Sequence, residues 1–245
     1  MSDPYEQIIW SADVLDVPAL LEWLDQLPLL RYIKIDRAFV DANGWSVFAE
    51  LEERGIEVFD DAKIIEIPSK LEQIAQTHCQ KARPWMLNCM AGGLSNANYE
   101  LSSKDLDGLK RFADTCHTHS VNPCAVSVLT SKSPEVVLDE FSREVSDQVL
   151  FYAEQLVLAE FTHMVCSPLE AKMLRQNHLF DGLKLVTPGV RPAGSDKGDQ
   201  SRVATPSGAI QDGSNYLVIG RPITNGPGTP AENLAAIAEE VASVL

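Results

Sequence analysis

The segment VFDDAKIIEIPSK, residues 58–70, starts as a β-rich apolar run and passes through a proline into a stretch with helical spacing. Asp61 and Lys63 stand two residues apart in the expected strand, so we expect their side chains to project to the same face. An acid and an amine would then share one site. Because burying two charges is costly unless they pair and form further hydrogen bonds, a purely structural ion pair is the alternative to a functional one.

The alternation of a β-rich run with an amphipathic segment continues on both sides of this stretch. The runs typical of strands are IIWSAD (8–13), YIKIDRAFV (32–40), IEVFDDAKI (56–64), WMLNCM (85–90), NPCAVSVLT (122–130), HMVCSP (163–168), LKLVTPG (183–189) and NYLVIGRPI (215–223). The segments with mostly helical spacing are 17–27, 45–55, 69–82, 103–120, 146–161, 169–179, the shorter 206–213, and 231–245.

Strands that alternate with helices predict a parallel sheet with right-handed crossovers. Eight such units with nothing left over favour closure into a (β/α)8 TIM barrel, an α/β fold in which residues 1–245 form a single domain. An open doubly wound sheet is the alternative. A glycine-rich dinucleotide fingerprint after the first strand would favour that alternative, and SADVLDVPAL, residues 11–20, contains none.

The formal net charge of −15 argues against a surface that binds a nucleic acid polymer or an anionic membrane, although a small basic pocket could still hold an anionic small molecule. The start of the chain, MSDPYEQIIW, lacks the basic segment and long apolar run of an export signal. No apolar run reaches the length of a bilayer. We therefore expect a soluble cytoplasmic protein.

The cysteines are odd in number, form no CxxC pair and mostly stand in apolar runs, so we expect structural thiols. They are Cys79, Cys89, Cys116, Cys124 and Cys166. His117 and His119 lie beside one of them in CHTHS, but no third ligand is apparent and basic residues are favourable at a helix end. No metal site is predicted.

Charged residues gather where the expected strands end, which is the face on which barrels of this kind build active sites. Besides Asp61 and Lys63, these residues are Asp13, Lys34, Asp36, Arg37 and Glu66. Converging charges of both signs can hold one another in fixed protonation states and shift their pKa values. A surface network of ion pairs would give the same pattern.

The end of the last expected strand predicts a phosphate site. Glycine at Gly220 lets a phosphate approach the backbone, and Arg221 supplies a planar pair of donors. An arginine that caps a helix or pairs with an acid is the alternative. The loop 187–206 carries Arg191, Lys197, Gln200 and Arg202, so it could close over an anionic ligand, or it could be a solvated loop.

With these residues in place, the chain resembles bacterial orotidine 5'-phosphate decarboxylase from residue 8 to residue 224. VFDDAKIIEIP (58–68) is similar to the family's Asp-x-Lys-x-x-Asp-Ile-Pro segment. The other similar segments are VSVLTS (126–131), VCSPLEA (165–171), KLVTPGVRP (184–192), GDQ (198–200) and YLVIGRPIT (216–224). The resemblance implies a barrel lyase of pyrimidine biosynthesis that converts orotidine 5'-phosphate to UMP without a cofactor.

The resemblance also implies roles. Asp61 is similar to the central carboxylate, Lys63 to the proton-donating lysine and Asp13 to the ribose-binding aspartate. Residues similar to those that bind the base and the phosphate are Thr130, Ser131, Arg191, Gln200, Gly220 and Arg221. Family members are homodimers that borrow the last acid of the motif from the partner subunit, so a dimer is implied, with Glu66 as that acid.

Five departures from the family pattern fall near the expected reacting centre. The family's lysine, aspartate, Asn-Thr, glycine and histidine correspond to Arg37, Glu66, Ser69-Lys70, Asp36 and Met90. We interpret Arg37 and Glu66 as catalytic and Lys70 as substrate-binding. The leading hypothesis is orotidine 5'-phosphate decarboxylation. One alternative is a paralogue that acts on a different phosphorylated nucleoside or sugar, with Arg37, Glu66 and Lys70 as specificity determinants. A further alternative is a non-catalytic nucleotide-binding protein.

Overall fold

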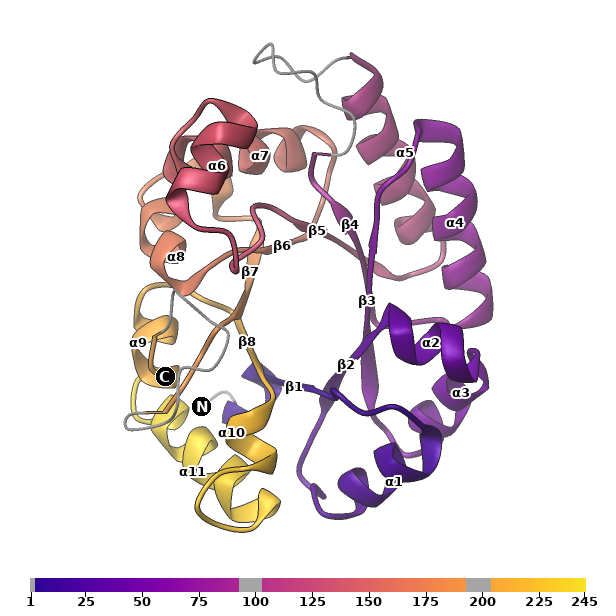
Figure 1. Cartoon of the computed structure of the whole chain (residues 1–245), viewed down its shortest axis with the longest axis vertical. Coiled ribbons are helices and arrows are strands. Elements are labelled where there is room, and N and C mark those ends of the chain that lie inside the picture. Colours follow the sequence, from indigo (N-terminus) through magenta and orange to yellow (C-terminus); the bar gives the residue numbers. More distant parts are fainter. Residues whose placement is uncertain (1–2, 93–102, 193–203) are drawn as a thin grey trace.

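The computed structural model describes residues 3–92, 103–192 and 204–245, and within them eight parallel strands close into a barrel in chain order (Figure 1). The strands are β1 (Ile8–Ser11), β2 (Tyr32–Asp36), β3 (Glu57–Ile64), β4 (Met86–Met90), β5 (Asn122–Val126), β6 (His163–Val165), β7 (Lys184–Pro188) and β8 (Tyr216–Ile219). Pairing of β8 with β1 completes the ring. The predicted TIM barrel is confirmed, and the open sheet is excluded.

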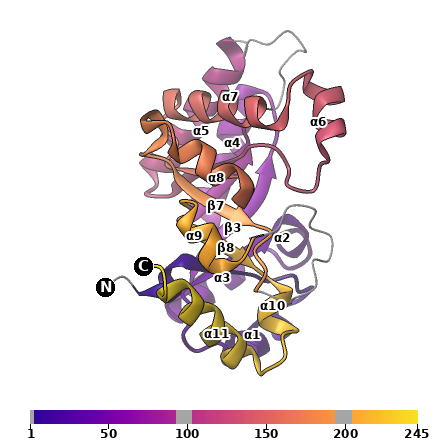
Figure 2. The same cartoon turned by 90° about the vertical axis from the view of Figure 1, so that its left-hand side faces the viewer.

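Helices surround the barrel, as the view turned by 90° shows (Figure 2). The helices at the expected positions are α1 (Val17–Asp25), α3 (Ser46–Glu53), α4 (Pro68–Lys81), α5 (Ser103–Thr118), α7 (Val145–Leu158), α8 (Pro168–Arg175), α9 (Pro206–Gln211) and α11 (Pro230–Ala242). The sequence reading missed α2 (Arg37–Asn43), α6 (Pro134–Phe141), α10 (Arg221–Thr224) and the 3-10 helices η1 (Pro4–Gln7) and η2 (His178–Phe180). The first element of the chain, η1, contacts its last helix, α11, and this contact brings the two ends of the chain together (Figures 1 and 2).

Several expected strands end earlier than predicted; the run 215–223, for example, leaves the sheet after Ile219 and continues into α10. Two of these corrections concern the runs 32–40 and 122–130. The run 32–40 leaves the sheet after Asp36, because the Asp36 carboxylate accepts a hydrogen bond from the Phe39 amide at 2.9 Å and caps α2. The run 122–130 leaves the sheet after Val126, so its last residues belong to the loop above the barrel. Both corrections change which side chains can reach the site.

The core has an inner part, inside the barrel, and an outer part, between the strands and the surrounding helices. Inside the barrel, residues of six different strands pack together: Ile9, Phe59, Met86, Cys124, Val186 and Val218. At the amino-terminal ends of the strands, Tyr32, Trp85, His163 and Tyr216 form an aromatic group. Burial, with a smaller effect of Lys184, lowers the pKa of His163 to about 3, so this ring stays neutral. Apolar packing at that end leaves the opposite end for a polar site.

All five cysteines lie in the described residues, and each is buried and outside any disulfide, as expected of structural thiols. Across the described ranges, no helix combines the length and the apolar character needed to cross a membrane.

Candidate active site

A cavity of about 350 Å³ opens at the carboxyl ends of the barrel strands. Side chains from several strand ends and the loops after them line it. Its polar and charged lining residues are Ser11, Asp13, Lys34, Asp61, Lys63, Thr130, Ser131, Arg191 and Arg221, and Gly189 and Gly220 contribute backbone. The cavity therefore contains most of the residues that the sequence predicted, together with Lys34, which forms a second ion pair with Asp61.

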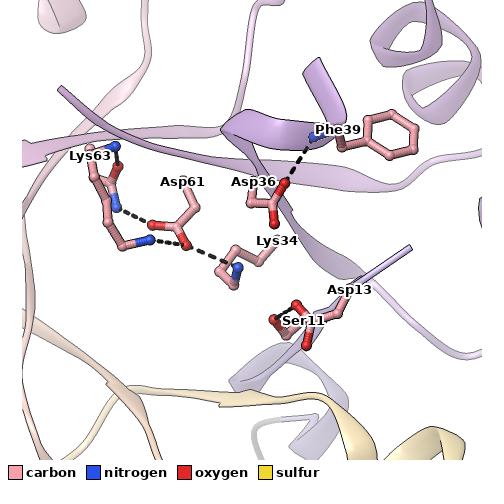
Figure 3. Close-up of polar contacts among 8 residues, drawn as sticks. Ser11, Asp13, Lys34, Asp36, Phe39, Asp61 and Lys63 are labelled. Atoms are coloured by element: carbon pink, nitrogen blue, oxygen red, sulfur yellow. Dashed lines mark hydrogen bonds and ion pairs between the residues drawn. The ribbon is translucent and has the colours of Figure 1, made fainter. Parts of the chain in front are cut away.

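The carboxylate of Asp61 lies at the centre of this arrangement, between two lysines (Figure 3). One oxygen, Oδ2, is 2.6 Å from Lys63 Nζ and 2.9 Å from Lys34 Nζ. The other oxygen, Oδ1, accepts a hydrogen bond of 2.6 Å from the amide of Asn88. Three donors thus converge on one carboxylate whose side chain is only 8% exposed.

The protonation states follow from these contacts. Burial by itself would raise the pKa of Asp61, but Lys34 and Lys63 outweigh burial and lower this pKa to about 2. Burial would lower the pKa of Lys34, but Asp61, and more weakly Asp13 and Asp36, raise it above its ordinary value. Asp61 is therefore an anion and Lys34 a cation at neutral pH. Lys63 is the more accessible lysine, with 41% of its side chain exposed.

Side-chain alternation along β3 explains why Asp61 and Lys63 meet. Phe59 packs inside the barrel, whereas Asp60 points outward and pairs with His78 of α4 at 2.7 Å. Asp61 and Lys63 follow on the inner side, and Ala62 packs in the outer core. The expectation that residues 61 and 63 share one face is confirmed.

Asp13 and the two arginines lie at other parts of the same cavity. Asp13 follows β1, and its Oδ1 accepts a hydrogen bond of 3.0 Å from Ser11 Oγ (Figure 3). Arg191 follows β7 and donates to the Val190 carbonyl oxygen at 2.8 Å. Arg221 is the first residue of α10, and Gly220 separates it from the end of β8. Both arginines thus lie in the region formed after the last two strands.

Arg37 does not lie in this cavity, contrary to our expectation. It is the first residue of α2, its side chain is 73% exposed, and it pairs with Asp41 at 3.4 Å. The physical reason is the cap at Asp36, which ends the strand and lets α2 begin at Arg37. Lys34, two residues before the cap, is the cation that β2 supplies.

Two further predicted residues lie outside the lining. Lys70 is exposed in the first turn of α4, where its ammonium donates to Gln73 at 2.8 Å, and its side chain does not line the cavity. Glu66 is exposed in the loop before α4 and accepts from the Ile67 amide at 3.1 Å. Of the other departures, Asp36 is the helix cap and Met90 ends β4. Gln200, with Lys197 and Arg202, lies outside the described residues.

Asn88 is the residue that sequence reasoning missed. It is fully buried in β4 and contacts both Asp61 and Lys63. Its signal was present, because it is the single polar side chain in the apolar run WMLNCM. Within the described parts of the chain, no group of His, Cys, Asp and Glu side chains is arranged to hold a metal ion.

The sequence of the chain matches a known protein family. A family model described as Orotidine 5'-phosphate decarboxylase / HUMPS family matches residues 6–237. The chain belongs to this family.

Proteins named orotidine 5'-phosphate decarboxylase resemble the chain over almost its whole length. The orotidine 5'-phosphate decarboxylase of Pseudoalteromonas translucida is 37% identical over 244 residues, which cover 97% of each protein. That of Moorella thermoacetica is 36% identical over 98% of this chain and 93% of its own. The crystal structure of the Lactobacillus acidophilus enzyme of that name superposes with a TM-score of 0.80 and 26% identity, over 96% of this chain and 99% of that one.

Proposed function

We propose that the protein is a carboxy-lyase that converts orotidine 5'-phosphate to UMP and carbon dioxide, with no cofactor. The observation that carries the proposal is the Lys63–Asp61–Lys34 arrangement, which faces a cavity of suitable size at the carboxyl end of a barrel. The relatives named orotidine 5'-phosphate decarboxylase, at 32–37% identity over nearly the whole chain, support it.

The cavity offers a separate place for each part of this nucleotide. Arg191 and Arg221 present guanidinium groups to the phosphate beside the backbone of Gly220, and a guanidinium binds a phosphate through paired hydrogen bonds. The Asp13 carboxylate can accept hydrogen bonds from the ribose hydroxyls. Thr130 and Ser131, after β5, can bind polar edges of the pyrimidine. Held in this way, the ring carboxylate would face Asp61 and Lys63.

The chemical step requires loss of carbon dioxide and gain of a proton. When the bond between the ring and the carboxylate breaks, its electron pair stays on the ring carbon, and carbon dioxide leaves. The ammonium of Lys63 stabilises this developing charge and then transfers its proton to the carbon, forming the new C–H bond. The anionic Asp61 disfavours the substrate carboxylate in the ground state and holds Lys63 in place. Lys34 keeps Asp61 ionised.

We also propose a homodimer in which Glu66 serves the partner's cavity. Glu66 does not line the cavity of its own chain, and it lies in the loop after β3. Its neighbours Ile65 and Ile67 are 55% and 49% exposed, which is unusual for large apolar side chains and suits a contact with a second subunit. Sedimentation equilibrium with the wild type and with Ile65→Asp tests this, since a monomeric wild type excludes the shared site.

The paralogue hypothesis gains no support from the geometry, because none of its three proposed specificity determinants, Arg37, Glu66 and Lys70, lines the cavity of its own chain. The decisive experiment is incubation with orotidine 5'-phosphate, followed through the fall of its ultraviolet absorbance and the appearance of UMP. Other phosphorylated nucleosides are compared under the same conditions. Turnover of another nucleotide with no orotidylate turnover contradicts the proposal, and binding of orotidylate without turnover indicates a binding protein.

A further inference from the structure

Strand β3 contains an irregularity opposite one residue of β4. Asp60 pairs in register with Leu87, and Ile64 pairs with Cys89. The three residues between Asp60 and Ile64 therefore face a single residue of β4, Asn88. Such a bulge leaves backbone groups without ladder partners, and bulges commonly lie next to active sites, where they aim a side chain. Because the excess is two residues, the inner and outer faces of β3 keep their alternation.

The backbone at Lys63 has an unusual conformation within this bulge. Its φ angle is +45°, in the left-handed region that costs a non-glycine residue about 1 kcal/mol or more. Lys63 has no register partner in β4, and its amide donates to the Asn88 side-chain oxygen at 2.7 Å. A side chain thus replaces the missing ladder bond at the residue that we assign as the proton donor.

The other end of the Asn88 amide contacts the central carboxylate. Its nitrogen donates to Asp61 Oδ1 at 2.6 Å. The orientation of the amide follows from its partners, because the Lys63 N–H needs an acceptor and the ionised Asp61 needs a donor. Asn88 is 0% exposed and does not line the cavity, so it contacts Lys63 and Asp61 but not the space for the substrate.

We propose that Asn88 is a positioning residue that fixes the Asp61 carboxylate and the Lys63 backbone relative to each other, and so places the Lys63 ammonium at the reacting carbon. This inference rests on the proposed function for its catalytic meaning, whereas the contact itself can be tested without substrate. Displacement of a catalytic group by about 1 Å can reduce a rate by about a hundredfold. Asn88 should therefore affect the chemical step more than it affects ligand binding.

The first test compares Asn88→Ala with Ser127→Ala. Ser127 is also buried, at 2% exposure, and donates one hydrogen bond of 2.8 Å to the Val165 carbonyl, but it does not line the cavity. We expect Asn88→Ala to lower kcat for orotidine 5'-phosphate about a hundredfold with the Kd of UMP nearly unchanged. Ser127→Ala should keep kcat within about twofold of wild type. Equal kcat values for the two variants would overturn the proposal.

The second test uses Asn88→Asp, which conserves shape and protects against a failure to fold. A protonated aspartic acid reproduces both contacts, since its O–H can donate to Asp61 while its carbonyl accepts from Lys63. An ionised one repels Asp61. The titratable and charged groups around this position are Asp61 and Lys63 of β3, Lys34 of β2 and the Cys124 thiol of β5. We expect the ratio of variant to wild-type kcat to rise as the pH is lowered, and a constant ratio would contradict the positioning role.

A measurement without substrate distinguishes a failure of the proposed function from a failure of the proposed role of Asn88. In protein labelled with ¹³C-aspartate, loss of the Asn88 donor should raise the pKa of Asp61 above its wild-type value in Asn88→Ala, whereas Ser127→Ala should leave it unchanged. If wild type fails to turn over orotidine 5'-phosphate but this pKa rises, the proposed function fails and the contact stands. If the pKa of Asp61 does not change, the proposed role of Asn88 fails whatever the activity.

Discussion

Lys34 Nζ lies 2.9 Å from Asp61 Oδ2, although Lys34 pairs in register with Phe59, two residues earlier on β3. The long side chain reaches along the barrel axis to a carboxylate that it keeps ionised, and only 13% of that side chain is exposed. The cation that supports Asp61 from the second strand is therefore Lys34, which the sequence reading placed among strand-end charges but did not assign to the site.

This relationship predicts different results for two neighbouring cations. Lys34→Ala removes one partner of a buried ion pair, so we expect kcat for orotidine 5'-phosphate to fall about a hundredfold or more. Arg37→Ala removes an exposed side chain of α2, so kcat should stay within about twofold of wild type. Steady-state kinetics of both variants decide the point. A severe loss of kcat in Arg37→Ala with a normal kcat in Lys34→Ala would support Arg37, and not Lys34, as the catalytic cation.

Lys63→Ala should abolish turnover while binding survives. A general acid contributes about a hundredfold to ten-thousandfold in rate, and its loss should appear in kcat. The Kd of UMP, measured by calorimetry, should change little because Arg191 and Arg221 remain. Lys81→Ala, an exposed lysine that ends α4, is the matched control. Near-normal kcat in Lys63→Ala would remove Lys63 from its proposed role.

Arg221→Ala should weaken ligands that carry a phosphate and leave unphosphorylated ones almost unaffected. For this accessible arginine we expect a loss of about 2 kcal/mol, which is about thirtyfold in the Kd of UMP. The Kd of uridine should not change. Arg54→Ala, which alters an exposed arginine at the end of α3, serves as the control. Equal losses for UMP and uridine would show that Arg221 has a structural role instead.

The low pKa of Asp61 predicts how the free energy of unfolding depends on pH. Because the folded-state pKa is about 2, below the ordinary 3.8, the stabilisation is present above about pH 4 and is lost as the pH falls through about 2. Asp60 acts in the opposite direction, since burial raises its pKa despite its contact with His78. Comparison with Asp61→Asn isolates the first effect. Urea unfolding at about pH 5 and pH 3 should show wild type losing about 1 kcal/mol more than the variant, and parallel losses would contradict this.

Much of the barrel could be predicted from the sequence because its signals are local. Each strand is a short β-rich run followed by a helical period, and eight such units specify a closed parallel sheet. The same local logic placed Asp61 and Lys63 on one face and Gly220 and Arg221 at a strand end. The negative net charge favoured an anionic small molecule as the ligand over a nucleic acid polymer or an anionic membrane.

Only the tertiary structure decided which charges meet. The choice between Lys34 and Arg37 depends on where β2 ends, and the hydrogen bond from Phe39 to the Asp36 side chain determines that end. The role of Asn88 depends on a register shift between β3 and β4, which no periodicity reveals because an insertion of two residues leaves the alternation of faces unchanged. Local sequence specifies strands and helices, but contacts between strands depend on register and on caps, and these are settled by packing.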